Sequence, residues 1–187
     1  AMQTREQHIR RDRATSNICT AQVLLAIMAS MYTVYHGPNG IKRIAERVNY
    51  LTALLAGSLE KAGFEFVHDH FFDTIRFKAD ANFISKANEA GMLLHDFGDG
   101  TLGINIDETS SAKDINDILN VFGAYAVEKA GITIQKELIR TTSYLDHPVF
   151  NTHHSETEML RYIYKLQQKD LSLATSMIPL GSCTMKL

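Results

Sequence analysis

Apolar side chains first gather in a stretch that predicts a helix over residues 15–35. Between residues 18 and 31 they fall on nearly every side of that helix, which is typical of a helix buried on several sides. Thr15 or Ser16 can supply the N-cap, because a short hydroxyl side chain accepts hydrogen bonds from unpaired backbone N–H groups. Gly37 and Pro38 follow the last periodic residue and predict its end.

Hydrophobic spacings of three and four residues then predict a second helix over residues 41–62. Beyond it the periodicity alternates between strand-like and helical segments. The predicted strands are 64–67, 71–77, 92–96 and 101–106, and the predicted helices are 81–90 and 112–130. Residues 97–100 predict a hairpin turn. The order predicts a small α+β domain, in which one antiparallel sheet carries helices on one face.

A connector without periodicity follows over residues 138–148, and one more helix is predicted over 156–168. Ser155 and Glu158 have the spacing of a capping box at the start of that helix. These elements predict a domain boundary between residues 138 and 150.

Composition changes this picture little. The chain has 187 residues, 45% of them hydrophobic and 21% charged, with a net charge of −2, which fits a folded soluble chain and gives no overall field for binding nucleic acid. The apolar run 23–28 is too short for a membrane span. With 2 cysteines, a disulfide framework and a structural zinc site are not expected, and we expect no metal site.

A polar block before the first helix is one candidate site. Thr15, Ser16 and Asn17 stand at a predicted helix N-terminus, and arginines precede them at positions 5, 10, 11 and 13. Hydroxyl and backbone N–H groups at such a terminus suit a phosphate. A plain N-cap without a ligand would account for the same residues, so a phosphate site and a helix cap both remain open.

A second candidate lies near residue 187. Pro179 and Gly181 interrupt regular structure, and Ser182, Cys183 and Thr184 follow with small hydroxyl and thiol groups. This segment suits close approach to a ligand. The alternative is an ordinary turn, since small polar residues commonly follow proline and glycine.

A third candidate is the group His147, His153 and His154. Metal ligation lacks a fourth ligand at a suitable spacing. A role for His154 in a polar pocket and a structural, hydrogen-bonded histidine are the remaining alternatives.

Long blocks of sequence then point to a family. The chain contains TREQHIRRDRATSNICTAQ over 4–22, HPVFNTHHSETEMLRYI over 147–163 and DLSLATSMIPLGSCTMKL over 170–187. In that order they resemble the glycine dehydrogenase (decarboxylating) family, the P-proteins of the glycine cleavage system. One departure is His153, where the family pattern has an aromatic residue.

The resemblance implies a pyridoxal phosphate (PLP) enzyme of fold-type I, the aminotransferase-like scaffold. It implies residues 1–40 as the end of a large PLP-fold domain, 41–140 as its small α+β domain, and 141–187 as the connector and arm of the second, catalytic half. It also implies that the Schiff-base lysine lies beyond Leu187 and that Lys186 is not that lysine. The implied cofactor contacts are Thr15, Ser16 and Asn17, and the implied neighbours of the active site are His154, Ser182, Cys183 and Thr184.

The implied reaction releases carbon dioxide from glycine and transfers the aminomethyl group to the lipoyl arm of the H-protein. The implied partners are lipoylated H-protein and a PLP-bearing half or subunit, within a homodimer or a two-subunit tetramer. The implied location is the cytoplasm in a bacterium or the mitochondrial matrix in a eukaryote. The alternative is a non-catalytic α+β interaction or scaffold module of a PLP-enzyme complex.

Overall fold

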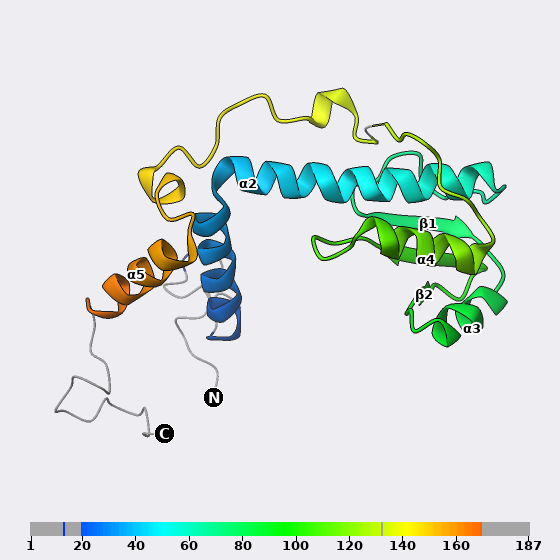
Figure 1. Ribbon diagram of the computed structural model, residues 1–187, viewed down its shortest axis with the longest axis horizontal. Coiled ribbons are helices and arrows are strands. Elements are labelled where there is room, and N and C mark those ends of the chain that lie inside the picture. Colours follow the sequence, from blue (N-terminus) through cyan, green and yellow to red (C-terminus); the bar gives the residue numbers. More distant parts are fainter. Residues whose placement is uncertain (1–12, 14–19, 132, 170–187) are drawn as a thin grey trace, which may run out of the picture. The chain divides into compact units, whose positions relative to one another are not determined.

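A computed structural model describes residues 13, 20–131 and 133–169 of the chain (Figure 1). The chain divides into two compact units. One comprises Ala1–Ile41 together with Ser143–Leu187, and the other comprises Lys42–Thr142. The second unit is an α+β domain with a small sheet, which confirms the predicted fold class at that level.

The longest element is helix α2, Thr20–Lys61, and it is broken at Gly37, where φ is 61° and ψ is −179°. This break confirms the interruption predicted at Gly37 and Pro38. The second helical segment resumes at Pro38 rather than at residue 41, because proline has no N–H to lose and its fixed φ suits the first position of a helix. The predicted caps Thr15 and Ser16 lie outside the described residues.

The segment of α2 before the break differs from the prediction of burial on several sides. Its apolar side chains over residues 23–28 are exposed in this chain, with exposed fractions of 41% for Val23, 66% for Leu25 and 59% for Met28, whereas Val34 near the break is 3% exposed. The apolar pattern is typical of a helix that packs against other parts of a protein, and the described residues of this chain do not bury these side chains.

The second unit contains an antiparallel sheet of 3 strands in the order β1-β3-β2. The strands are β1 Thr74–Lys78, β2 His95–Asp96 and β3 Thr101–Asn105. Each is shorter than predicted, and the predicted strand 64–67 is reduced to an isolated bridge between Phe66 and Phe77. The turn between β2 and β3 confirms the predicted hairpin.

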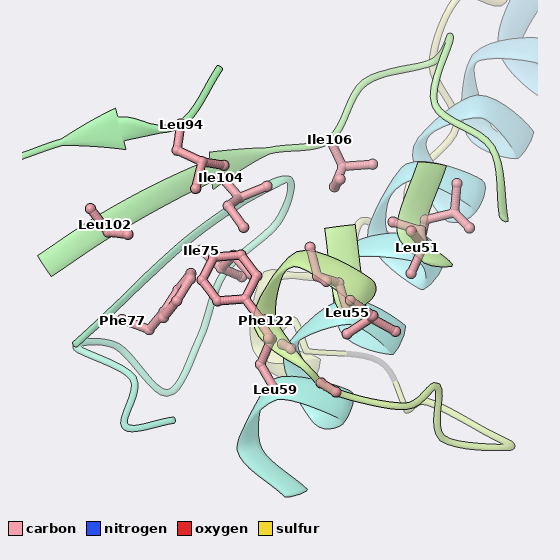
Figure 2. Packing of buried hydrophobic residues seen from close by; sticks show 14 of the residues in the cluster. Leu51, Leu55, Leu59, Ile75, Phe77, Leu94, Leu102, Ile104, Ile106 and Phe122 are labelled. Carbon is pink, nitrogen blue, oxygen red and sulfur yellow. The ribbon is translucent and has the colours of Figure 1, made fainter. Parts of the chain in front are cut away.

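The hydrophobic core lies between one face of this sheet and the helices (Figure 2). Ile75 and Phe77 of β1 are paired with Ile104 and Leu102 of β3, so these side chains share a face. Against it pack Leu51, Leu55 and Leu59 of α2, together with Ile115, Leu119 and Phe122 of α4. Burial of this apolar surface is the main term that holds the unit together.

The opposite face of the sheet is polar. The guanidinium of Arg76 lies 3.9 Å from the ring centroid of Phe97 and donates through Nε to Thr101 Oγ1 at 2.8 Å. It also pairs with the carboxylate of Asp99 in the hairpin turn. These contacts tie the turn to β1.

Two shorter helices complete the unit: α3, Asn82–Glu89, and α4, Ala112–Phe122. A complete capping box starts α4, since Ser111 accepts from Asp114 N and the Asp114 carboxylate accepts from Ser111 N. The predicted extension of this helix to residue 130 is wrong. Gly123 adopts a left-handed φ of 67° and ends it, which is the usual role of glycine after a helix.

A buried side-chain amide joins α2 to two segments of the chain, one just before β1 and one after α4. Asn49 is 6% exposed, and its Nδ2 donates to Phe72 O at 2.9 Å and to Thr133 Oγ1 at 2.8 Å. The Thr133 hydroxyl donates in turn to Phe71 O at 2.6 Å. The chain after α4 is thereby held on α2 by satisfied polar groups rather than by apolar packing alone.

Short turns and one helix occupy the later part of the chain: η2 Lys136–Leu138, η3 Pro148–Asn151 and α5 Glu156–Gln167. Ser155 caps α5 by accepting from Glu158 N at 3.2 Å. The Glu158 side chain does not complete the predicted box, because its carboxylate lies 3.7 Å from Arg161 instead. The helix 156–168 is confirmed, within one residue at its end.

Candidate functional site

Of the residues that the family resemblance places at the cofactor or the active site, the structure describes His154. The others, Thr15, Ser16 and Asn17 at one end and Ser182, Cys183 and Thr184 at the other, lie outside the described residues. Arg13, next to the first group, is described and exposed. The geometry on which a site can be built is therefore that around His154.

His154 lies at the break in α2. Its Nδ1 is 2.8 Å from Tyr35 O, the carbonyl two residues before Gly37. An ideal Cβ built on Gly37 would lie 2.6 Å from His154 Cε1 and 2.6 Å from Phe150 O. Glycine is needed here for two reasons: its φ is positive, and its neighbours leave no room for a side chain.

The same segment makes a second contact with the break. The hydroxyl of Tyr144 donates to Pro38 O at 2.7 Å. Both contacts are between residues of one compact unit, although 106 and 119 positions separate the partners in sequence. The predicted connector is thus anchored on α2 at two carbonyl groups.

Aromatic and imidazole rings lie near the break in α2 and on the neighbouring segment that carries His154. Tyr32 and His36 have ring centroids 4.3 Å apart, and His36 also meets Tyr35 edge-on at 5.1 Å. The ring of His153 stacks on Tyr162 of α5 at 4.3 Å. Its Nδ1 is a buried polar atom with no hydrogen-bond partner among the described residues. Stacking on Tyr162 explains why a flat ring suits position 153.

The described residues hold no group of three or more His, Cys, Asp or Glu that could bind a metal ion. His147, the third histidine of the predicted group, accepts from Val149 N at 3.2 Å and caps η3. The histidines at 147, 153 and 154 therefore have three separate structural environments.

Perturbed carboxylates lie in turns and helix caps of the other unit. A hydrogen bond from the Thr101 hydroxyl is the main cause that lowers the pKa of Asp99. Hydrogen bonds from Thr109 and then Ser110 lower the pKa of Asp107, and one from Ser111 lowers the pKa of Asp114. Each shift comes from hydrogen bonding to the charged form in a local turn, so these groups indicate structural rather than catalytic roles.

A surface hollow of about 360 Å³ lies in the same unit between β3, the chain before β2 and the start of α4. Its polar lining residues are His95, Asn105 and Asp114. The Asp114 carboxylate accepts from Ser111, and the Asn105 amide donates to Thr74 Oγ1 at 2.6 Å. Two of these three polar groups are thus engaged within the unit, and the ring of His95 lies edge-on to Phe97, with ring centroids 4.4 Å apart.

Comparison with known proteins identifies the family. The family model for the glycine cleavage system P-protein matches residues 1–122. The chain belongs to the P-protein family of the glycine cleavage system. This confirms the family inferred from the sequence blocks.

Relatives named glycine dehydrogenase (decarboxylating) match the whole chain. Those of Aliivibrio salmonicida and Thermosynechococcus vestitus are each 54% identical, over 200 and 192 residues. Both alignments cover 100% of this chain but 21% and 20% of the relatives. The chain thus spans about a fifth of the length of these relatives.

A solved structure, the inhibitor-bound glycine decarboxylase (P-protein) of the glycine cleavage system, is also similar. It is 27% identical, with a TM-score of 0.48 over 65% of this chain and 30% of that one.

Sequence reasoning named His154 but missed its partner, the carbonyl of Tyr35, and the other contacts at the break. Tyr144 lies in the predicted connector 138–148, and its hydrogen bond to Pro38 O joins positions 106 residues apart. The one local signal was the Gly37-Pro38 pair, which predicted a helix break without indicating what packs against it.

No described helix is long and apolar enough to cross a membrane.

Proposed function

We propose that this chain is part of a PLP-dependent glycine decarboxylase that releases carbon dioxide from glycine and passes the aminomethyl group to the lipoyl arm of the H-protein. The observation that carries the proposal is 54% identity, over the whole chain, to relatives named glycine dehydrogenase (decarboxylating). The fold-type I scaffold belongs to the same proposal.

The residues available at one end fit the phosphate of PLP by their chemistry. Thr15 and Ser16 offer hydroxyl donors, Asn17 offers an amide, and Arg13 beside them is exposed. Hydroxyl, amide and guanidinium groups are the usual donors to a phosphate. When bound, PLP supplies an electron sink that stabilises negative charge on the carbon that loses the carboxylate. Thr15, Ser16 and Asn17 would bind and orient the cofactor.

The segment Ser182-Cys183-Thr184 would line the glycine side of the site. Its hydroxyl groups can donate to a carboxylate, and its small side chains allow close approach. His154 would lie in the vicinity of the site rather than in contact with glycine, because its Nδ1 faces a backbone carbonyl. The Schiff-base lysine would belong to sequence beyond Leu187.

The partners in this proposal are glycine, lipoylated H-protein and the PLP-bearing half or subunit, in a homodimer or two-subunit tetramer. The location would be bacterial cytoplasm or mitochondrial matrix. These finer statements rest on the family alone.

We also propose the three-part division 1–40, 41–140 and 141–187. The exposed apolar segment of α2 supports it, because a helix with apolar side chains all round is typical of the interior of a larger domain. A single flat partner would cover one side only. In the longer protein, this segment would be an interior helix at the end of the large domain.

A chimera tests the function. The corresponding fifth of the Aliivibrio salmonicida enzyme is replaced by this chain, and exchange of labelled bicarbonate into the carboxyl group of glycine is measured with PLP and lipoylated H-protein. We expect exchange by the chimera and none by this chain alone. A folded, PLP-loaded chimera without exchange would favour the scaffold module.

Thr15→Ala with Ser16→Ala in that chimera tests the phosphate contact. Loss of about two hydrogen bonds to a charged group predicts a dissociation constant for PLP that is roughly a hundredfold larger. Cofactor absorbance after dialysis would measure the loss of PLP. Thr20→Ala, further along the same stretch, is the matched control. Unchanged retention in the double variant would remove these residues from the cofactor site.

A further inference from the structure

We propose that His154 and Tyr144 are positioning residues that lock the break in α2, by donating hydrogen bonds to backbone carbonyls on either side of Gly37. The lock consists of these two side chains and the backbone of Phe150. It goes beyond the proposed enzyme function and does not depend on it, because every contact is within one unit of this chain.

The first step concerns unpaired carbonyls. A helix leaves its last four C=O groups without intrahelical partners, and the first segment of α2 ends at Gly37. Pro38 adds to the deficit, since it has no N–H to offer the carbonyl four residues earlier. His154 meets this need at Tyr35 O, 2.8 Å from Nδ1. Histidine side chains near a helix C-terminus are known to cap final carbonyls and to favour that end of the helix dipole.

The second step fixes the tautomer. A carbonyl oxygen only accepts hydrogen bonds, so Nδ1 of His154 must carry the proton that it donates to Tyr35 O. In the neutral ring the proton is then on Nδ1 and Nε2 is the acceptor. This is a specific and measurable state of one side chain.

The third step concerns the segment that carries the two residues. Leu145, next to Tyr144, has a φ of 56° and is the one non-glycine residue with positive φ among the described residues. Asn151 Nδ2 braces the turn by donating to Leu145 O at 3.0 Å and His147 O at 3.2 Å. A left-handed leucine costs conformational energy, and such strain persists where surrounding contacts over-determine it.

The fourth step is steric. Phe150 O and His154 Cε1 fill the place where a Cβ of Gly37 would be. Tyr144 adds its hydroxyl to Pro38 O at 2.7 Å. The contacts fall at positions 35, 37 and 38, so the segment 144–154 contacts the break at three successive places along its backbone.

The test compares isosteres in the full chain. The amide nitrogen of asparagine occupies nearly the place of Nδ1 in histidine, and that of glutamine nearly the place of Nε2. Amide hydrogen exchange is followed in residues 144–154 and in the last turn of the first α2 segment. We expect His154→Gln and Tyr144→Phe to speed exchange there by about three- to tenfold, the size of one lost hydrogen bond. His154→Asn should stay within about twofold of the wild type.

His70→Gln is the matched control, because His70 Nδ1 also lies near a carbonyl, Thr133 O at 3.2 Å, but in the other unit. It should leave exchange in residues 144–154 unchanged. Nitrogen NMR of the wild-type chain should find the proton of neutral His154 on Nδ1, a signature that general packing would not produce.

A proton on Nε2, or wild-type exchange in both Tyr144→Phe and His154→Gln, would overturn the proposal. If His154→Gln fails to fold, Tyr144→Phe removes a single oxygen atom, and the wild-type tautomer still decides the outcome.

Discussion

At the scale of single residues, Gly37 carries the sharpest constraint. Its φ is 61°, and an added Cβ would lie 2.6 Å from the backbone oxygen of Phe150. Gly37→Ala should therefore lower the free energy of unfolding by the cost of a left-handed alanine, about 1–2 kcal/mol, and by roughly 1–3 kcal/mol more for the collision. Urea unfolding followed by circular dichroism measures the sum.

Gly123→Ala separates the two contributions. Gly123 has a similar φ of 67°, but an added Cβ there would meet nothing within 4 Å. Its substitution should cost the conformational part alone. Equal losses in the two variants would mean that the segment 144–154 does not press on Gly37.

Asn49 is the second residue whose loss should be felt, because it is 6% exposed and donates to Phe72 O and Thr133 Oγ1. Asn49→Ala leaves those acceptors without this donor, which should cost about 1–3 kcal/mol of unfolding free energy. Thr52→Val is the matched control in the same helix, since Thr52 Oγ1 bonds only within the helix, to Val48 O at 2.9 Å. If Asn49→Ala lowers the free energy of unfolding no more than Thr52→Val does, Asn49 does not hold the segment around Thr133 on α2.

At the scale of elements, the start of α4 makes stability depend on pH. The Ser111 hydrogen bond lowers the pKa of Asp114 in the folded chain. A depressed folded pKa contributes stability above the unfolded pKa, near 4, and that stability is lost as pH falls through the folded value. Asp114→Asn should therefore destabilise α4 at pH 7 and flatten its dependence on acid, measured by urea unfolding at several pH values.

Ser111→Ala tests the other half of the box and should cost about 1 kcal/mol while also reducing the acid dependence. Ser155→Ala is the comparison, because Ser155 caps α5 without a reciprocal carboxylate. If neither Ser111→Ala nor Asp114→Asn changes how the free energy of unfolding depends on pH, the capping box is not the source of that dependence.

Elements were predictable where local chemistry decides them. The helices 81–90 and 156–168 and the hairpin at 97–100 follow from periodicity, caps and turn residues, all of which act within a few positions. The end of α4 was missed because apolar spacing was followed through Gly123, whose left-handed φ stops the helix. The strand predicted over 64–67 is reduced to a single bridge at Phe66, because pairing partners, and not propensity, decide whether a strand forms.

The site was predictable only in part, for a related reason. His154 stands out in sequence, but Tyr35 O, its partner, is a backbone atom 119 positions away and leaves no mark in the sequence. The strain at Leu145 is equally invisible, because leucine is an ordinary residue for a helix or strand. Long-range contacts to backbone atoms can be found only once the fold is known.

At the scale of the whole molecule, the first segment of α2 poses the remaining question. Leu24, Leu25 and Ile27 are 62%, 66% and 51% exposed, at successive angles around the helix. The chain spans about a fifth of the length of its relatives. If the rest of such a protein surrounds this helix, a charge introduced on it should have little effect on the stability of this chain alone and a large effect on that of the longer protein. Leu25→Lys in this chain alone should change unfolding free energy by less than about 0.5 kcal/mol, as at a surface.

The same Leu25→Lys in the chimera with the Aliivibrio salmonicida enzyme should cost several kcal/mol or prevent folding, because an unpaired charge would be buried. Gln22→Lys, exposed on the same helix but polar in the wild type, should be tolerated in both contexts. Thermal unfolding of the four proteins gives the comparison. Tolerance of Leu25→Lys in the chimera would place this helix at a surface of the longer protein, and its apolar residues would then have to meet a separate partner.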